Sequence, residues 1–392
     1  MPEIRALRIL HTIQSLSPAD GGPPQAVRNL MKAYPELGVQ AEVMCMDEPG
    51  TEFLKDVNAP VHALGGRRGK FGYSAVAGRW LEARVGDFDA VVVHGIWSYQ
   101  NLAVRAAAAK CRVPYAVFPH GALDPWFNKQ YPLKKLKKQM FWRWQYPVLR
   151  DAKAVLFTSE TEHDLAATSF RPSGWNGMPV PYGAMEPEGD AERQREAFLA
   201  GMPQLRGEQG GSRRFLLFLA RIHEKKGCDL LLEAFARVAE ADAELQLVMA
   251  GPDQVGLQAR LEEQAKARGI AERVHWPGML SGDVKWGALR CCEAFVLPSH
   301  QENFGIAVAE ALACGRPVLI SNQVNIWPDI VEDHAGLVEE DSLAGTEALL
   351  RRWVEMGEEE RAGYVARTLP CFRKRYSMRE TARAIRGLFA GA

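Results

Sequence analysis

The residues with the clearest chemical potential are two glutamates in the C-terminal half of the chain. Glu302 and Glu310 lie in the segment 299–310, which reads Ser-His-Gln-Glu-Asn-Phe-Gly-Ile-Ala-Val-Ala-Glu and follows a short apolar run at 294–297. This order predicts Glu302 in a loop after a buried strand and Glu310 two turns into a helix over 306–314. A carboxylate accepts two hydroxyls at once, so we expect the first glutamate to bind a sugar and the second a ribose.

The stretch between the glutamates adds backbone donors to the same place. The N–H groups of Asn303, Phe304, Gly305 and Ile306 are predicted to face the ligand, with the positive end of the helix behind them. A Glu-x7-Glu spacing by itself means little, because surface helices are rich in glutamate. Its position after a buried strand favours a binding role over a solvated surface.

A basic loop precedes this motif along the chain. Arg221 and Lys226 bracket a loop between a strand predicted over 214–220 and a helix predicted to begin near Asp229. The two cations can converge on one diphosphate, the arginine as a fork of donors and the lysine as a point charge. They would also offset the charge that develops on a departing nucleoside diphosphate. On charge alone, a solvated basic loop is an equal alternative.

Gly21 and Gly22 follow the first predicted strand, 7–13, and precede an amphipathic helix predicted over 25–34. Glycines at such a junction let backbone N–H groups approach a phosphate or a sugar. The alternative is an ordinary turn with proline at the start of a helix. Because the spacing is not GxGxxG, it counts against a dinucleotide-binding dehydrogenase.

Apolar runs rich in Val, Ile and Leu alternate with amphipathic stretches along the whole chain, which predicts parallel strands covered by helices on both faces. A chain of 392 residues exceeds the usual size of one core, so we expect two doubly wound α/β domains with a cleft between them. The predicted domains are 1–187 and 188–375, with a final helix at about 376–392 packing back on the first. The polar segment 186–213 is predicted to link them.

Bulk composition excludes several classes of protein. Lys plus Arg and Asp plus Glu are 48 each, so no net field predicts nucleic acid as a partner. Seven cysteines without CxxC spacing predict neither a zinc site nor a disulfide framework. No run approaches the roughly 20 apolar residues of a membrane span, and the N-terminus does not read as a signal peptide. We therefore expect a cytoplasmic protein.

The three motifs occur in the order found in family 4 glycosyltransferases of the GT-B fold, which the chain resembles. They are Gly21-Gly22, Arg221 with Lys226, and Glu302 with Glu310, and the resemblance covers both domains. It implies an α/β protein of GT-B architecture, with two Rossmann-like doubly wound domains facing a central cleft. It also implies retaining, hexosyltransferase-type transfer from a UDP- or GDP-sugar, with no obligatory metal or other cofactor.

The resemblance assigns roles to individual residues. Arg221 and Lys226 would bind the diphosphate, Glu302 the donor sugar and Glu310 the ribose, while the base would lie near Gly278 and Met279. Similar enzymes also place a histidine near the reaction centre from a loop of the first domain. His120 is the best candidate here, with a structural hydrogen bond as its alternative.

No carboxylate is obviously placed as a covalent nucleophile. We therefore expect same-face substitution, in which the leaving diphosphate takes the acceptor's proton while Arg221 and Lys226 stabilise it. On the acceptor side we expect His94, at the end of a predicted strand, together with Trp97 and Asp124, in loops after strands of the first domain. His11, in the first strand, is predicted to be structural.

A basic, aromatic segment at 129–150 suggests a second surface. Pro132 can begin a helix, and one face of it would carry an apolar stripe of Leu133, Leu136, Met140 and Trp144. On the opposite side Trp142 falls among lysines. Candidate contacts to anionic lipid headgroups are Lys134, Lys135, Lys137 and Lys138. A solvated lysine face on an ordinary packed helix is an equal alternative.

The function predicted from these features is transfer of a sugar to a lipid-linked or growing cell-surface glycan, as in polysaccharide or lipopolysaccharide biosynthesis. The enzyme would be cytoplasmic, and peripheral on the inner face of the plasma membrane if the basic segment binds lipid. Two alternatives stay open: a nucleotide-sugar epimerase of the same fold, and a non-catalytic nucleotide-sugar-binding subunit.

Overall fold

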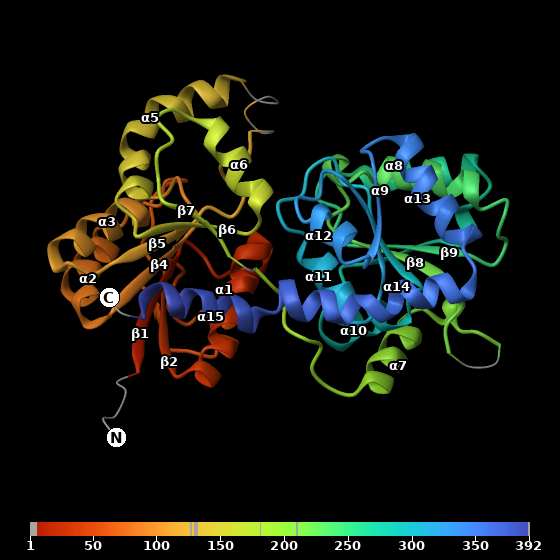
Figure 1. Cartoon of the computed structure of the whole chain (residues 1–392), viewed down its shortest axis with the longest axis horizontal. Helices are drawn as coiled ribbons and strands as arrows, with labels where there is room; N and C mark the ends of the chain where they lie inside the picture. Colours follow the sequence, from red (N-terminus) through yellow and green to blue (C-terminus); the bar gives the residue numbers. More distant parts are fainter. Residues whose placement is uncertain (1–5, 126–127, 129–131, 181, 209–210, 391–392) are drawn as a thin grey trace. The chain divides into compact units, whose positions relative to one another are not determined.

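The computed structural model describes residues 6–125, 128, 132–180, 182–208 and 211–390. These residues fold into two α/β units, Met1–Gly183 with Met378–Ala392, and Ala184–Ser377. Each unit contains one parallel sheet with helices on both faces (Figure 1). The predicted fold class, two Rossmann-like sheets, is confirmed.

The first unit has the strand order β3-β2-β1-β4-β5-β6-β7, and the neighbouring strands pair in parallel. Its strands are β1 (Leu7–Ile13), β2 (Val39–Cys45), β3 (Val61–Ala63), β4 (Ala90–His94), β5 (Tyr115–Phe118), β6 (Ala154–Phe157) and β7 (Gly177–Pro179). Its helices include α1 (Gly22–Ala33), α2 (Ala75–Arg84), α3 (Tyr99–Cys111), α5 (Pro132–Arg150), α6 (Glu160–Ser169) and α15 (Met378–Phe389).

The central strands of this sheet are apolar on both faces. β4 reads Ala-Val-Val-Val-His and is buried along its whole length, as are β5 and β6. Strands of this kind are typical of a parallel sheet that is covered on each side by helices. Because parallel strands all end at the same edge of a sheet, β1, β4 and β5 bring the loops that follow them close together.

The second unit has the strand order β10-β9-β8-β11-β12-β13, again parallel. Its strands are β8 (Phe215–Leu219), β9 (Gln246–Ala250), β10 (Val274–Gly278), β11 (Ala294–Leu297), β12 (Val318–Ser321) and β13 (Gly336–Glu339). Its helices include α7 (Ala191–Gly201), α8 (Cys228–Val238), α9 (Leu257–Ala267), α10 (Gly282–Cys291), α11 (Ile306–Ala313), α12 (Trp327–Glu332), α13 (Leu343–Glu355) and α14 (Glu358–Cys371).

The prediction of a linker over 186–213 is wrong, because this segment contains helix α7. α7 packs against α10 within the second unit, and Phe198 is fully buried. The two helices approach so closely that a Cβ atom on Gly287 would lie 1.9 Å from the carbonyl oxygen of Gln194. A few large apolar side chains are enough to hold a helix where glycine permits such an approach.

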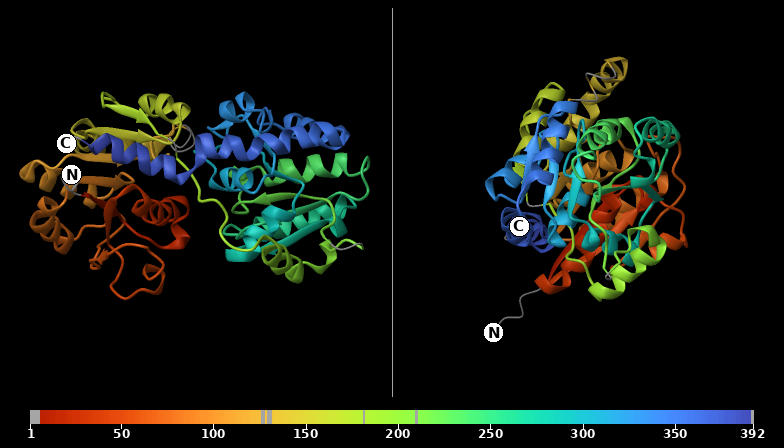
Figure 2. Two further views of the ribbon diagram at one scale, coloured as in Figure 1. Left: turned by 60° about the horizontal axis from the view of Figure 1, so that its bottom comes forward. Right: turned by 90° about the vertical axis from the view of Figure 1, so that its right-hand side faces the viewer.

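The last helix of the chain belongs to the first unit. α15 packs against α1, which lies near the other end of the sequence (Figures 1 and 2). Its buried side chains recur at helical spacing, at Met378, Ala382, Ile385 and Phe389. This periodicity is typical of an amphipathic helix that covers a core.

Candidate functional site

The predicted donor residues of the second unit lie at the carboxyl ends of its central strands. β8 and β11 are neighbours in the sheet, so the loop after β8 and the loop after β11 leave the same edge side by side. The first loop carries Arg221 and Lys226, and the second carries Glu302. Open parallel sheets bind their ligands at this edge.

Lys226 and Glu302 form an ion pair between the two loops, from Nζ to Oε2. The side chains are 10% and 21% exposed, which leaves the pair partly open to solvent. Burial by itself would raise the pKa of the Glu302 carboxyl, but the charge and hydrogen bond of Lys226 outweigh it, and the pKa lies below its ordinary value. Glu302 is therefore ionised at neutral pH and able to accept hydroxyl groups.

A close backbone contact holds this pair together. The turn Glu224–Lys226 ends at Gly227, whose φ is 67°, and a Cβ atom there would lie 2.0 Å from the carbonyl oxygen of Pro298. The carbonyl of Lys225 accepts hydrogen bonds from the His300 N–H at 2.9 Å and the Ser299 hydroxyl at 3.0 Å. Glycine is thus required where the loop after β8 crosses the loop after β11.

The N-terminus of α11 lies directly after Glu302. Gly305 caps the helix with a φ of 78°, and Ile306 is its first residue. The first N–H groups of a helix have no acceptor within it, so they can bind an anion. Phe304 is buried and packs edge-on against Tyr376, with ring centroids 5.7 Å apart. The Phe304 side chain is therefore not available to a ligand, and its backbone N–H stays the predicted contact.

Glu310 is held by a lysine that the motif does not contain. Its Oε1 lies 2.6 Å from Nζ of Lys285 on α10, and the glutamate side chain is only 9% exposed. Lys285 also lies over the ring of Trp286, 4.3 Å from its centroid. The pairing fixes the orientation of the carboxylate. Within the described residues its Oε2 accepts no hydrogen bond, and the binding of a ribose hydroxyl by this carboxylate stays a prediction.

The other predicted donor residues are more exposed. Arg221 donates from Nη1 to Oε1 of Gln254 at 3.3 Å. Gly278 ends β10, where its carbonyl accepts a hydrogen bond from the Gly251 N–H at 2.8 Å, and the Met279 side chain is 67% exposed. Both positions lie at the same edge of the sheet as Lys226 and Glu302, and the base-binding role of Gly278 and Met279 stays a prediction.

In the first unit, three histidines form a continuous hydrogen-bonded chain across neighbouring strands. His11 Nδ1 lies 2.9 Å from His94 Nε2, and His94 Nδ1 lies 2.9 Å from His120 Nε2. Tyrosines terminate the chain at both ends: the Tyr34 hydroxyl is 3.0 Å from His11 Nε2, and the Tyr182 hydroxyl is 3.4 Å from His120 Nδ1. Both ring nitrogens of His120 therefore have partners.

All three histidines are held neutral. Burial lowers the pKa of His11 and of His120 to about 3, and burial with the two neighbouring imidazoles lowers that of His94 well below its ordinary value. A neutral imidazole donates from one nitrogen and accepts at the other, so the tautomer of each ring determines that of the next. The hydrogen bonds couple the three rings, while the acceptor-side role of His94 and the catalytic role of His120 stay predictions.

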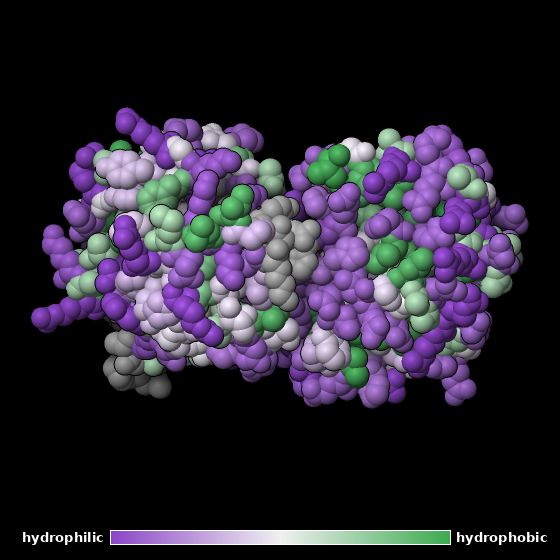
Figure 3. Space-filling model, turned by 90° about the horizontal axis from the view of Figure 1, so that it is seen from above, coloured by the Kyte–Doolittle hydropathy of each residue, from purple (hydrophilic) through white to green (hydrophobic). Residues whose placement is uncertain are grey.

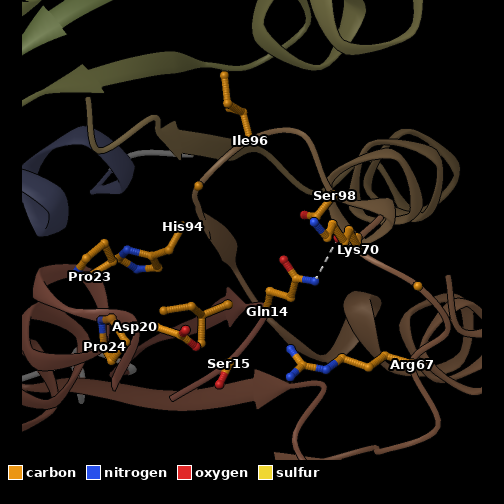
Figure 4. Close-up of a pocket in the computed structure, with 13 residues that line it drawn as sticks. Gln14, Ser15, Asp20, Pro23, Pro24, Arg67, Lys70, His94, Ile96 and Ser98 are labelled. Carbon is orange, nitrogen blue, oxygen red and sulfur yellow. Dashed lines mark hydrogen bonds between the residues drawn. The ribbon is translucent and has the colours of Figure 1, made fainter. Parts of the chain in front are cut away.

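Beside this chain lies a cavity of about 610 Å³ (Figure 4). Pro23 and Pro24, directly after the Gly21-Gly22 pair, form part of its wall, and His94 faces it. The polar and charged lining residues that the sequence analysis missed are Gln14, Ser15, Asp20, Arg67, Lys70 and Ser98. The signal that could have revealed them is the segment 65–70, Gly-Gly-Arg-Arg-Gly-Lys, which combines flexible glycines with cations.

The other two residues expected on the acceptor side lie elsewhere. Trp97 packs between Trp142 and Phe170, with ring centroids 5.5 and 5.3 Å away. Asp124 is buried after β5. Neither lines the cavity beside His94.

Helix α5 presents its apolar stripe to solvent. Leu133, Leu136, Met140 and Trp144 are 78%, 62%, 68% and 45% exposed. Trp142, which the sequence analysis placed among the lysines, is instead buried and donates from Nε1 to the carbonyl of Pro172 at 2.8 Å. The first part of the basic segment, 129–131, lies outside the described residues.

Three of the four lysines on α5 are exposed, whereas Lys138 lies over the ring of Trp97, with Nζ 5.0 Å from its centroid. Figure 3 shows the face of the molecule that carries α5, where hydrophobic side chains of the first unit lie among hydrophilic ones. Among the described residues, no helix combines the length and apolar character needed to cross a bilayer.

No group of three or more His, Cys, Asp or Glu side chains within the described part of the chain is arranged to hold a metal ion. At the donor edge of the sheet Lys225 also acts electrostatically on Glu302, beside the predicted pair of Arg221 and Lys226. These two side chains are the candidates to balance the charge of a diphosphate.

Two family models match the chain. The one described as "Glycosyl transferase 4-like domain" matches residues 21–183, and the one described as "Glycosyl transferases group 1" matches residues 206–367. The chain belongs to the family 4 glycosyltransferases. The range matched in the first unit contains Gly21, Gly22, His94 and His120. The range matched in the second unit contains every donor residue that the sequence analysis predicts there.

Curated relatives share only part of their length with this family 4 chain. The D-inositol 3-phosphate glycosyltransferase of Geodermatophilus obscurus is 38% identical over 111 residues, which cover 26% of this chain and 25% of that protein. The mannosylfructose-phosphate synthase of Agrobacterium fabrum is 26% identical over 230 residues, which cover 54% and 48%. The chain thus spans between a quarter and about half of the length of these relatives.

Solved structures resemble this family 4 chain over nearly its whole length. Alr3699/HepE of Anabaena, in complex with UDP and glucose, has a TM-score of 0.74 at 16% identity, covering 98% of this chain and 100% of that one. Sucrose-phosphate synthase of Thermosynechococcus elongatus has a TM-score of 0.71 at 17% identity, with the same coverage. At such identities the likeness shows the GT-B fold alone.

Proposed function

We propose that the chain is a retaining glycosyltransferase that moves a hexosyl group from a UDP- or GDP-sugar to a hydroxyl acceptor. The observation that carries the proposal is the Lys226–Glu302 ion pair at the carboxyl ends of β8 and β11, directly before the N-terminus of α11. A diphosphate needs cations and backbone donors, whereas a sugar needs carboxylates. This edge of the sheet offers all three.

In the proposed reaction, the bond between the sugar C1 and the diphosphate oxygen breaks while the acceptor oxygen bonds to C1 on the same face. The acceptor's proton passes to an oxygen of the leaving diphosphate. Lys226 has three donors, so it can retain Glu302 while it binds a phosphate oxygen. Arg221 and Lys226 supply the positive charge that stabilises the leaving group, so we propose no obligatory metal.

UDP-glucose is the first donor to test, since Alr3699/HepE has been determined with UDP, with UDP-glucose, and with UDP and glucose. We propose an acceptor that is a lipid-linked or growing cell-surface glycan, including lipopolysaccharide. The relatives add phosphorylated sugars and polyols to the range of acceptors to test, because their names are D-inositol 3-phosphate glycosyltransferase and mannosylfructose-phosphate synthase.

The decisive experiment measures binding and turnover in the same preparation. UDP and GDP should raise the melting temperature, because a ligand that binds only the folded chain stabilises it. Turnover of the matching sugar nucleotide should release the nucleoside diphosphate and retain the anomeric configuration. Binding without turnover over a broad set of acceptors would favour a non-catalytic subunit, and conversion of the donor without transfer would favour an epimerase.

We also propose that α5 docks on the anionic inner face of the plasma membrane. Its exposed lysines attract acidic headgroups, and its exposed apolar stripe can enter the acyl boundary. Lys137 borders the stripe at helical spacing, four residues after Leu133 and three before Met140, so this lysine and the stripe can contact the surface together. Such docking would bring the enzyme to a lipid-linked acceptor.

This proposal predicts that two kinds of substitution weaken binding to vesicles that contain phosphatidylglycerol. Replacing Lys134, Lys135 and Lys137 by glutamine should reduce binding by about tenfold or more, since each cation contributes on the order of 1 kcal/mol near such a surface. Replacing Leu133, Leu136 and Met140 by serine should reduce the salt-resistant part of binding.

The control replaces Lys55 and Lys110, exposed lysines elsewhere in the first unit, by glutamine. Co-sedimentation with vesicles at low and high salt measures all variants. If the control weakened binding as much as the α5 variants, or if the α5 variants bound like the wild type, α5 would not be the docking helix.

A further inference from the structure

The cavity of the first unit has one positively charged wall. Arg67 and Lys70 lie on one side of it, and Asp20, Pro23 and His94 lie on the other (Figure 4). Among the described residues that line the cavity, Asp20 is the only acidic one, and His94 is neutral because burial and its two histidine neighbours depress its pKa. The lining therefore carries a net positive charge. Lysine and arginine gathered in a cavity of this size favour an anionic ligand.

Neither cation is neutralised by the protein itself. Within the described residues, Arg67 and Lys70 are both exposed and neither takes part in an ion pair. The nearby buried carboxylate of Asp47 is already occupied, since it accepts the Ser15 hydroxyl and the Leu16 N–H, each at 2.7 Å. The two side chains are thus available to a ligand.

The turn that carries the cations is held in place by the backbone. Arg68 and Tyr73 exchange hydrogen bonds, from each N–H to the other's carbonyl, at 2.9 and 3.2 Å. Gln14 at the end of β1 donates to the Lys70 carbonyl at 3.4 Å, and a Cβ atom on Gly72 would lie 2.8 Å from the Gln14 amide nitrogen. The site is therefore built before a ligand arrives, which reduces the entropy cost of binding.

The phenyl ring of Phe71 anchors the same turn from the other side. The ring packs edge-on against Tyr99 and Phe141, with ring centroids 6.2 and 5.4 Å away. The backbone carbonyl of Phe71 accepts a hydrogen bond from the Tyr99 N–H at 2.8 Å. The turn that carries Lys70 is thus held by the backbone bonds between Arg68 and Tyr73 and by the packing of Phe71.

The rest of the lining suits a polyhydroxylated ring. Gln14 offers its side-chain carbonyl and Asp20 its carboxylate as acceptors for hydroxyl groups. Pro23, Pro24 and Ile96 supply apolar surface for the C–H face of a ring. Because one cavity contains hydroxyl-binding groups and two cations, it favours a ligand that has both hydroxyls and a negative charge.

From this arrangement we infer that the cavity binds the acceptor, and that the acceptor carries a phosphate which Arg67 and Lys70 recognise. This inference rests on the proposed transferase function, because it names the class of acceptor that the transferase would use. The phosphate can belong to a soluble sugar phosphate or to a lipid whose sugar is joined through phosphate. The chemistry at Arg67 and Lys70 is the same for both.

The test uses the full chain saturated with UDP, so that phosphate cannot bind at the donor edge. Glucose 6-phosphate is titrated against glucose in one arm. Phosphatidylcholine vesicles with and without phosphatidylinositol are titrated in the other. We expect binding that requires the phosphate, and Arg67→Gln with Lys70→Gln should weaken it about tenfold or more, because hydrogen bonds to charged groups are among the stronger ones.

Arg68→Gln is the matched control, since Arg68 lies in the same turn but does not line the cavity. Its affinity should stay within about threefold of the wild type, a shift of well under 1 kcal/mol. Dependence on Arg67 and Lys70 in the glucose 6-phosphate arm identifies a soluble acceptor, and the same dependence in the vesicle arm alone identifies a lipid-linked one. Equal binding of glucose, an equal effect of Arg68→Gln, or no binding in either arm would overturn the inference.

The outcome also separates this inference from the proposed function. A chain that binds UDP in a Lys226-dependent way but binds neither phosphate probe would remain a candidate transferase with an uncharged acceptor. A chain that binds glucose 6-phosphate through Arg67 and Lys70 but binds no nucleotide would lose the transferase assignment while the anion site stood.

Discussion

Glu302→Gln is expected to lower kcat/KM for the donor by about 10²- to 10³-fold, the range seen when one preorganised electrostatic contact at a reaction centre is removed. The carboxylate binds the donor sugar in our proposal, and it also holds Lys226 in place through their ion pair. Lys226→Met should cause a loss of similar size. Steady-state kinetics with UDP-glucose or GDP-mannose measure both variants.

A double substitution distinguishes a shared role from two separate ones. If the pair acts as a unit, Lys226→Met combined with Glu302→Gln should cost far less than the product of the two single effects. The matched control is Lys266→Met with Glu263→Gln, an exposed Lys–Glu pair on α9 of the same unit, where the atoms are 2.6 Å apart. If the double variant lost as much kcat/KM as the product of the two single losses, or if the control variants lost as much, Lys226 and Glu302 would not act as a unit.

The pH dependence of stability offers a second check on the pair. The pKa of Glu302 is lower in the folded chain than in the unfolded one, so its stabilising contribution is present above the ordinary glutamate pKa and is lost as pH falls through the folded value. Glu302→Gln should therefore remove part of the acid sensitivity below about pH 4.3. Denaturant titrations at pH 7 and at pH 3.5 measure this difference.

Substitutions at His94 are expected to separate the two contacts of the histidine chain. The amide of asparagine reaches about as far as Nδ1, and that of glutamine about as far as Nε2. His94→Asn should therefore keep a partner for His120, while His94→Gln should keep one for His11. Because His120 is the candidate beside the reaction, we expect His94→Gln to reduce turnover by about tenfold more than His94→Asn.

Both His94 variants should lose a similar amount of stability, about 1 to 3 kcal/mol, since each leaves one buried imidazole nitrogen without a partner. Ring-nitrogen chemical shifts measured by NMR should show His120 in one tautomer in the wild type and in His94→Asn, and in a mixture in His94→Gln. Equal turnover in the two variants, together with an unchanged His120 tautomer, would show that the chain has only a structural role.

The histidine chain also has a defined pH signature. His11 and His120 have a pKa of about 3 in the folded chain, and ordinary histidine titrates near 6.5. Between these values the unfolded chain binds more protons, so stability falls as pH decreases from about 6.5. His94→Asn removes one of the three titrating rings and should make this slope shallower.

The strong strands were predictable because their signal is local. The runs at 7–13 and 294–297 coincide with β1 and β11, since a strand buried on both faces must be apolar at nearly every position. The short strands β3, β7 and β13 have no such run. They pair at or near the edges of their sheets, where neighbouring strands rather than their own residues define them.

The domain boundaries were less accurate than the strands. The predicted divisions at 187 and 375 compare with 183 and 377 in the structure, while α7 occupies the segment expected to be a linker. Composition identified a polar segment, but only the approach of Gln194 to Gly287 shows that it packs as a helix. That contact joins residues far apart in the chain, which no local pattern contains.

The amino-acid order therefore determines the class of fold, the family, and the residues that line up at the carboxyl ends of the strands, because these depend on periodicity and short motifs. Which side chains meet depends on tertiary packing. The Lys226–Glu302 and Lys285–Glu310 pairs, the hydrogen-bonded chain from Tyr34 to Tyr182, and the cavity that Arg67 and Lys70 line all bring together residues from separate loops, helices and strands. The motif of Glu302 and Glu310 predicted a donor site from the sequence. Only the tertiary structure shows that Lys226 and Lys285 pair with these two carboxylates.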